Sequence, residues 1–279
     1  MNNFETNKIT VLYHNDADGF CSAFAYWLKF RNNATYIPVQ YNQPVPEIPK
    51  ETKKLKIVDF SYNRETCISL AERFGHDNII IIDHHKTAEA ELKDLDFVIF
   101  NNSKSGAVLT WEYIFPYEKA PAIFQYVQDR DLWKFKLPYS KEVNSYIATF
   151  PFDFNIWLTF NLQEAMDAGK GIIAFQKQQI ERAIKNVSVE KFYGYLVPIV
   201  NLSDNISEIG NELCIRHPLS KFSVSYCDRN NNQRTYSLRS IGDFDVSEIT
   251  KHFGGGGHKN AAGFSIEKPE VFKYKESVT

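Results

Sequence analysis

The sequence predicts an α/β protein whose N-terminal part is a doubly wound parallel sheet with helices on both faces. Short apolar runs, typical of strands buried on both sides, alternate with helix patterns over the first 130 residues. This alternating order is characteristic of a parallel sheet. The expected strands are Ile9–Tyr13, Tyr36–Tyr41, Leu55–Phe60, Asn78–Ile82 and Phe97–Phe100.

Two helices between these strands are marked by apolar residues at i, i+3, i+4 and i+7, within 20–27 and 67–74. Asn63 is placed to cap the start of the second helix, and Gly75 is placed to end it. A further helical stretch is expected over roughly Thr110–Val127.

Three parts are expected along the chain. An N-terminal domain occupies 1–161, a helical connector 162–188, and a smaller C-terminal α/β domain 189–279. The last part contains the apolar strand "YLVPIV", two strands around a polar turn, and a short helix capped by Asp245.

The bulk properties are those of an ordinary globular chain of 279 residues, with 43% hydrophobic and 24% charged residues. A net charge of −2 argues against a stable complex with long nucleic acid, which normally needs a basic excess. The four cysteines are far apart and form no CxxC, so a reducing, cytoplasmic location is expected rather than disulfides or a zinc knuckle. No apolar run is long enough to span a membrane.

Acidic and imidazole residues follow three of the expected strands, at the sheet edge where such folds bind ligands. They are His14, Asp16, Asp18, Asp59, Asp83, His84 and His85. Carboxylates held this close cannot all stay ionised without cations, and the set is large enough for two. Mixed oxygen and nitrogen donors suit Mn²⁺ and leave Mg²⁺, Co²⁺ and Fe²⁺ open. The alternative is a set of helix caps and solvated loop ends.

Four short motifs follow one another along the chain, "HNDADG", "VDFS", "DHH" and "QDRDLW", and "GGGGHKNAAG" stands near the C-terminal end. The first four resemble, in sequence and order, the motifs of the DHH phosphoesterase superfamily, and the last resembles that of the family's associated C-terminal domain. The resemblance spans nearly the whole chain. It implies a metal-binding catalytic domain followed by a substrate-binding domain, with the active site in the cleft between them.

The resemblance also implies a ligand set for two metals. Asp16 would bind the first metal and Asp59 would bridge both, while the ligands of the second would be Asp18, His84 and Asp129. Asp131 is the competing aspartate of the fourth motif, with a supporting or capping role as its alternative.

His14 is expected to bind the first metal, although it departs from the commoner family pattern. Many members place this histidine four residues before the first aspartate, a position occupied here by Leu12. A loop histidine that only contacts phosphate is the alternative.

By its resemblance to the family pattern, His85 is not expected to bind metal directly but would face the substrate phosphate as a cationic donor or proton source. Asp83 would orient a neighbouring histidine by accepting a hydrogen bond.

Phosphate contacts are expected from the C-terminal domain and one serine. Glycine-rich backbone approaches anions closely, and arginine binds phosphate through two N–H groups. The expected residues are Arg239, Gly255, Gly256, Gly257, His258, Lys259 and Ser105. A flexible linker, a surface ion pair for Arg239 and helix capping by Ser105 are the alternatives.

The function expected from these features is a two-metal phosphodiesterase that cleaves short oligonucleotides or linear and cyclic dinucleotides. A metal-bridging hydroxide would attack phosphorus. Hydrolysis of polyphosphate or pyrophosphate at the same site is the first alternative, followed by a single-strand exonuclease and a non-catalytic nucleotide-binding module. A monomer or a homodimer is expected.

Overall fold

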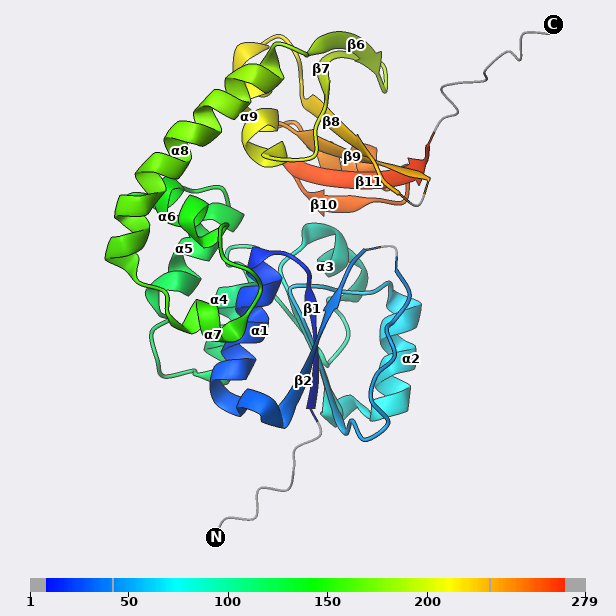
Figure 1. Cartoon of the computed structure of the whole chain (residues 1–279). Helices are drawn as coiled ribbons and strands as arrows, with labels where there is room; N and C mark the ends of the chain where they lie inside the picture. Colours follow the sequence, from blue (N-terminus) through cyan, green and yellow to red (C-terminus); the bar gives the residue numbers. More distant parts are fainter. Residues whose placement is uncertain (1–8, 42, 231, 269–279) are drawn as a thin grey trace, which may run out of the picture. The chain divides into compact units, whose positions relative to one another are not determined.

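The computed structural model describes residues 9–41, 43–230 and 232–268. The chain divides into two compact units between Phe175 and Gln176. Each unit is built around its own β-sheet (Figure 1). The finer domain boundaries expected from the sequence remain predictions.

The sheet of the first unit has five parallel strands in the order β2-β1-β3-β4-β5. The strands are β1 (Ile9–His14), β2 (Ala34–Val39), β3 (Lys54–Val58), β4 (Ile79–Asp83) and β5 (Val98–Phe100). Because the first strand lies inside the sheet and the chain extends to both sides of it, the predicted doubly wound topology is confirmed. All five carboxyl ends lie along one edge.

Helices cover both faces of this sheet, as predicted. One face carries α1 (Ala17–Phe30), α4 (Gly106–Ile114) and α5 (Ala122–Asp131) around a large apolar core, to which α6 (Ser140–Ile147) and α7 (Phe154–Leu158) contribute. The other face carries α2 (Arg64–Phe74) and α3 (Lys86–Leu92) around a smaller core. Two short 3₁₀ helices, Arg31–Asn33 and His76–Asn78, precede β2 and β4.

The predicted limits of α2 are confirmed, whereas the helix predicted over Thr110–Val127 is wrong. The Asn63 side chain accepts the N–H of Thr66, and Gly75 ends α2 with a φ of 85°. Two helices, α4 and α5, replace the single predicted one. The loop between them, 115–121, contains two prolines, which lack a backbone N–H and interrupt helices.

The long helix α8 (Leu162–Ile184) lies within the segment predicted as the connector, and the division between the two units falls within this helix. The second unit has a six-stranded mixed sheet in the order β10-β11-β9-β8-β7-β6. Its strands are β6 (Ser188–Phe192), β7 (Tyr195–Asn201), β8 (Ser223–Asp228), β9 (Gln233–Arg239), β10 (Gly256–His258) and β11 (Ala261–Glu267), and its helices are α9 (Ile206–Arg216) and α10 (Val246–Lys251).

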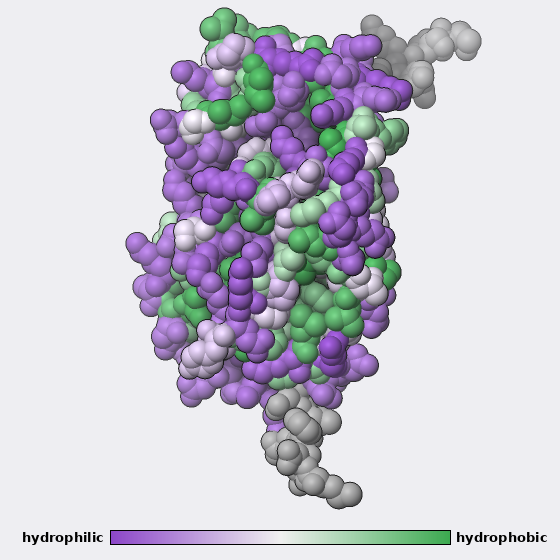
Figure 2. Space-filling model, turned by 90° about the vertical axis from the view of Figure 1, so that its left-hand side faces the viewer, coloured by the Kyte–Doolittle hydropathy of each residue, from purple (hydrophilic) through white to green (hydrophobic). Residues whose placement is uncertain are grey.

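On the face drawn in Figure 2, hydrophilic residues predominate and apolar residues form smaller groups between them, an ordinary pattern for a globular surface. Within the described residues, no helix combines the length and apolar character needed to cross a membrane.

Candidate metal centre

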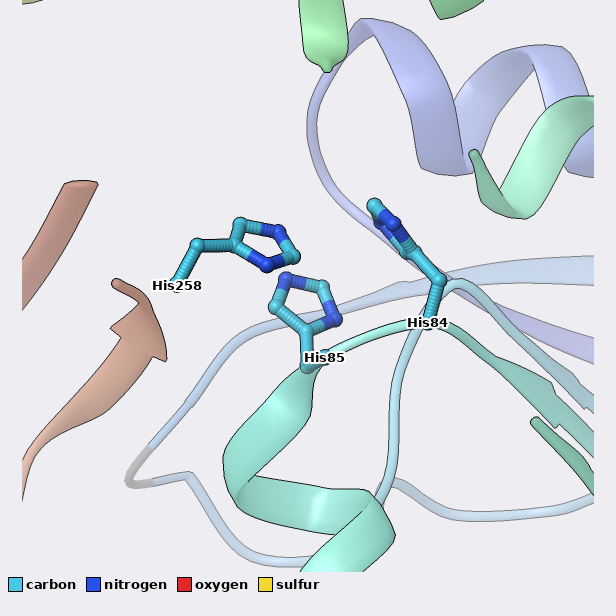
Figure 3. A group of neighbouring side chains, drawn as sticks. All are labelled: His84, His85 and His258. Carbon is cyan, nitrogen blue, oxygen red and sulfur yellow. The ribbon is translucent and has the colours of Figure 1, made fainter. Parts of the chain in front are cut away.

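The acidic and imidazole residues predicted from the sequence gather at the carboxyl edge of the first sheet. His14 ends β1, and Asp16 caps the helix that follows it. Asp59 follows β3 directly, and His84 and His85 follow β4 at the entrance to α3 (Figure 3). The parallel topology therefore brings together side chains that are up to 71 residues apart in the chain.

The first group of candidate metal ligands is formed by His14, Asp16 and Asp59. One donor atom from each lies within 4.8 Å of the others. His14 Nδ1 lies 2.9 Å from Asp16 Oδ2 and 3.8 Å from Asp59 Oδ2. Burial lowers the pKa of His14, but the two carboxylates outweigh burial and raise it to about 10. In the metal-free protein this histidine therefore carries the positive charge that a cation would replace.

The second group consists of Asp18, His84 and Asp131, whose donor atoms also lie within 4.8 Å of one another. His84 Nε2 lies 3.6 Å from Asp18 Oδ2 and 3.6 Å from Asp131 Oδ2. The Asp18 carboxylate accepts the backbone N–H groups of Gly106 and Ala107 at the start of α4, which hold it in place. Burial, followed by repulsion from Asp18, raises the pKa of Asp131 to about 7.

Asp59 lies between the two groups. Its Oδ2 faces His14, and its Oδ1 lies 3.1 Å from His84 Nε2. The residue is 1% exposed and has a φ of 54°, a backbone conformation that costs energy for a residue with a Cβ. Burial and the charges of Asp18 and Asp16 raise its pKa well above the usual range for a carboxyl. The two oxygens of Asp59 thus point at different groups, as the predicted bridging ligand requires.

Two glycines make room for these ligands. A Cβ on Gly106 would lie 2.5 Å from the Cβ of Asp59, and a Cβ on Gly19 would lie 2.1 Å from the carbonyl oxygen of His14. In neither case is there space for a side chain. Glycine is therefore needed at position 19, within α1, because a side chain would not fit there, and not because the backbone makes an unusual turn.

The donor set fits divalent cations. Asp59 Oδ1 and Asp131 Oδ2 are buried, and neither has a hydrogen-bond partner within the described residues. Buried carboxylate oxygens normally have a partner, and a bound cation supplies one. Carboxylate oxygen combined with imidazole nitrogen suits Mn²⁺ and related first-row metals.

Asp129, which the sequence analysis favoured over Asp131 as a metal ligand, is instead bonded to the loop that follows α5. Its Oδ1 and Oδ2 accept the backbone N–H groups of Lys136 and Leu137, both at 3.0 Å. These bonds close the loop after α5 and lower the pKa of Asp129 against the opposing effect of burial. It belongs to neither ligand group. The structure therefore places Asp131, not Asp129, beside His84.

Asp83 links His85 to a serine that the sequence did not single out. Its Oδ1 lies 2.7 Å from His85 Nδ1 and also accepts the backbone N–H of His84, while Ser61 Oγ donates to Oδ2 at 2.6 Å. Asp83 is fully buried, and its carboxylate has a pKa held below the usual range, chiefly by His85 acting against burial. The histidine that Asp83 orients is therefore His85, and donor atoms of Asp59, Asp83 and His85 also lie within 4.8 Å of one another.

Ser105 caps α4, as the alternative interpretation had it. Its hydroxyl accepts the N–H of Val108, its own N–H donates to Gln128, and the residue is fully buried. The buried hydroxyl supports the start of α4, whose first two N–H groups hold Asp18, rather than facing solvent.

The predicted phosphate-binding residues of the second unit lie on its last three strands or directly beside them. Arg239 ends β9, and its guanidinium donates to Ser207 Oγ and to the carbonyl oxygen of Leu238. Gly255 precedes β10, while Gly256, Gly257 and His258 form it. Lys259 Nζ forms an exposed ion pair with Asp243 at 2.9 Å.

Close packing accounts for two of these glycines. A Cβ on Gly255 would lie 2.2 Å from the carbonyl oxygen of Gly263, and one on Gly257 would lie 2.6 Å from that of Ala261. Gly257 also has a φ of 137°. The hairpin of β10 and β11 therefore needs glycine there irrespective of any anion.

Residues 8–132 match the family model described as "DHH family, N-terminal domain", and residues 220–274 match the DHHA1 domain. The chain is also 34% identical over 289 residues to the uncharacterized protein R106 of Acanthamoeba polyphaga mimivirus, in an alignment covering 92% of this chain and 67% of that protein. This chain belongs to the DHH family.

Two further comparisons place this DHH chain among its relatives. Oligoribonuclease NrnB of Bacillus subtilis (strain 168) is 25% identical over 292 residues, with 91% of this chain and 71% of that protein covered. The structure of RecJ from Thermus thermophilus, in complex with Mn²⁺, has a TM-score of 0.52 at 13% identity, covering 93% of this chain and 49% of that one. The second likeness confirms the DHH fold and nothing further.

Sequence reasoning missed two residues of this DHH site and ranked a third one second. Ser61 stands two positions after Asp59 and could have been found as a polar residue following a buried strand. Gly106 gives no sequence signal, because its neighbour Asp59 is remote in the chain. Asp131 was recognised only as the second choice, since spacing alone does not say which of two nearby aspartates points at the sheet edge.

Proposed function

We propose that the chain is a two-metal phosphohydrolase, and specifically a phosphodiesterase acting on short oligonucleotides or linear and cyclic dinucleotides. The observation that carries the proposal is the position of Asp59 between two groups of ligand atoms, with one oxygen facing each. A paired-metal centre needs a shared carboxylate of this kind. The activity in the name of the related oligoribonuclease NrnB supports the choice of a nucleotide substrate.

We assign His14, Asp16 and Asp59 to the first metal, and Asp59, Asp18, His84 and Asp131 to the second. Asp131 replaces the predicted Asp129 because a carboxylate oxygen of Asp131, and none of Asp129, lies within 4.8 Å of donor atoms of both Asp18 and His84. Mn²⁺ is the metal that we propose for both positions, with Mg²⁺, Co²⁺ and Fe²⁺ as the ions to compare. When bound, two such cations supply a nucleophile from water and neutralise charge on the phosphoryl group.

The residues around the metals have separate tasks in this proposal. His85 faces the substrate, with Nδ1 held by Asp83 and with Nε2 as the nitrogen that donates a proton to a phosphate or leaving-group oxygen. Ser61 fixes the Asp83 carboxylate in turn. Arg239, His258 and Lys259 remain our candidates for binding phosphate on the second unit.

A substrate panel tests this function. The chain is assayed with Mn²⁺, Mg²⁺ or a chelator against a short oligoribonucleotide, a short deoxyoligonucleotide, linear and cyclic dinucleotides, and polyphosphate. We expect metal-dependent cleavage of the short nucleotides and none with chelator. Release of phosphate from polyphosphate with all the nucleotides left intact would contradict the proposal in favour of phosphoanhydride hydrolysis.

A further inference from the structure

Tyr41 lies on the loop after β2, which is tied to the loop that carries the first metal ligands. The backbone N–H of Asn15 donates to the carbonyl oxygen of Val39 at 3.1 Å. The side-chain Nε2 of Gln40 donates to the carbonyl oxygen of Asn15 at 3.4 Å. These two contacts join the ends of β1 and β2. Tyr41 is therefore held beside the candidate metal centre.

Three rings surround that of Tyr41. The ring centroid lies 5.1 Å from that of His14 and 5.9 Å from that of His85, both edge to face, and 4.8 Å from that of Phe60. Phe60 is 1% exposed and forms a fixed support, whereas Tyr41 is 44% exposed. One side of the tyrosine thus rests on the protein, and much of the remainder is accessible.

An exposed ring in this position has a specific use. His14 belongs to the first ligand group and His85 is the proposed phosphate contact, so a phosphate bound there lies next to Tyr41. In a nucleotide, the base is joined to its phosphate through a single sugar. Aromatic side chains bind single-stranded nucleotides by stacking on the bases, with little sequence preference because every base has a π-face. Polyphosphate offers no such group.

We propose that Tyr41 stacks on the nucleobase next to the phosphate held at the candidate metal centre. It would thereby select nucleotides over base-free phosphates. This inference rests on the phosphodiesterase function proposed above and adds a residue that sets its substrate class.

The test compares two substrates with the same sugar–phosphate backbone, the dinucleotide pApA and its abasic analogue, using the full chain with Mn²⁺. Tyr41→Leu is expected to raise the KM for pApA about tenfold, within the range found for loss of base stacking. The kcat of Tyr41→Leu for pApA is expected to stay near the wild-type value, and so are its kcat and KM for the abasic analogue. Tyr41→Phe and Tyr41→Trp keep a ring and should keep the wild-type KM or lower it.

Tyr117→Leu is the matched control, because Tyr117 is a tyrosine of the same unit whose side chain is 99% exposed. An unchanged KM for pApA in Tyr41→Leu would overturn the inference, as would a raised KM in Tyr41→Trp. An equal fall in kcat for both substrates would also overturn it, because Tyr41 would then only position His14 and His85. If the wild-type chain cleaves neither pApA nor its abasic analogue, the proposed phosphodiesterase function fails together with this inference. That result differs from failure of the inference alone, in which the wild-type chain still cleaves pApA.

Discussion

Replacing Gly106 by alanine should damage the metal centre without touching a metal ligand. The added Cβ would lie 2.5 Å from the Cβ of Asp59 and 2.6 Å from its Oδ1, closer than the 3.0 Å that real Cβ contacts keep. Asp59 must therefore move by about 0.5 Å, or α4 must shift. Asp59 is buried with a strained φ and has little freedom to adjust.

This displacement should change both the free energy of unfolding and the Mn²⁺ affinity. Overpacking of a buried site costs about 1–3 kcal/mol in the free energy of unfolding. Metal-ligand distances tolerate about 0.2 Å, less than half of the required shift. Disturbing the supports of metal ligands typically weakens metal binding about 10–100-fold. We therefore expect Gly106→Ala to lose at least about tenfold in Mn²⁺ affinity while remaining folded.

Isothermal titration with Mn²⁺ measures the affinity, and urea unfolding in the presence of chelator measures the stability. The matched control is Gly171→Ala in α8, where a Cβ meets nothing within 4 Å. This variant should gain up to about 1 kcal/mol from helix propensity and bind Mn²⁺ like wild type. If Gly106→Ala also binds Mn²⁺ like wild type, the placement of Asp59 between two metals is refuted.

Three further predictions concern the neighbours of Asp59. Asp131→Asn should weaken Mn²⁺ binding about 10–100-fold in titration, whereas Asp129→Asn should mainly lower the thermal unfolding temperature, because it weakens two backbone hydrogen bonds. If instead Asp129→Asn loses Mn²⁺ affinity and Asp131→Asn loses only stability, Asp129 is the ligand. Because the pKa of Asp131 is raised to about 7 in the metal-free protein, the free energy of unfolding measured with chelator should fall as pH rises from about 4 to about 7, and Mn²⁺ affinity should rise over about pH 6–8. If Asp131→Asn shows the same pH dependence of both quantities as wild type, this carboxyl is excluded as the cause. Ser61→Ala should lower kcat with unchanged Mn²⁺ affinity, since it frees the Asp83 carboxylate that orients His85, and a wild-type kcat would show that the serine is dispensable.

The sheet and the gathering of ligands could be predicted because both follow from short-range pattern and general topology. Apolar runs identify buried strands, and parallel topology places all their carboxyl ends at one edge. His14, Asp59 and His84 therefore converge as expected without any knowledge of their distances. Membership of the DHH family, which the four motifs predicted, is confirmed by the family models.

The choice between Asp129 and Asp131 could not be made from the sequence. Both lie at the end of α5, and the direction of each side chain depends on the phase of the helix. The N–H groups that capture Asp129 belong to a loop with two left-handed residues, Trp133 and Phe135, whose path no local pattern indicates. The break between α4 and α5 was missed for a different reason, because the apolar spacing continued through the two prolines.

The steric role of Gly106 and the exposure of Tyr41 are also tertiary properties. Each depends on a partner from another strand end, so composition and periodicity carry no signal for them. The metal ligands and phosphate contacts proposed for this chain remain predictions until metal and substrate binding are measured.

The most direct test of a paired-metal phosphodiesterase is the rate of pApA hydrolysis against Mn²⁺ concentration for wild type and Asp59→Asn. Asp59 touches both ligand groups, so its loss should impair both metals at once. We predict a wild-type rate that depends on Mn²⁺ and disappears with chelator, and a variant at least about 100-fold slower at every concentration. A variant as active as wild type, or a wild-type rate indifferent to chelator, would contradict the account.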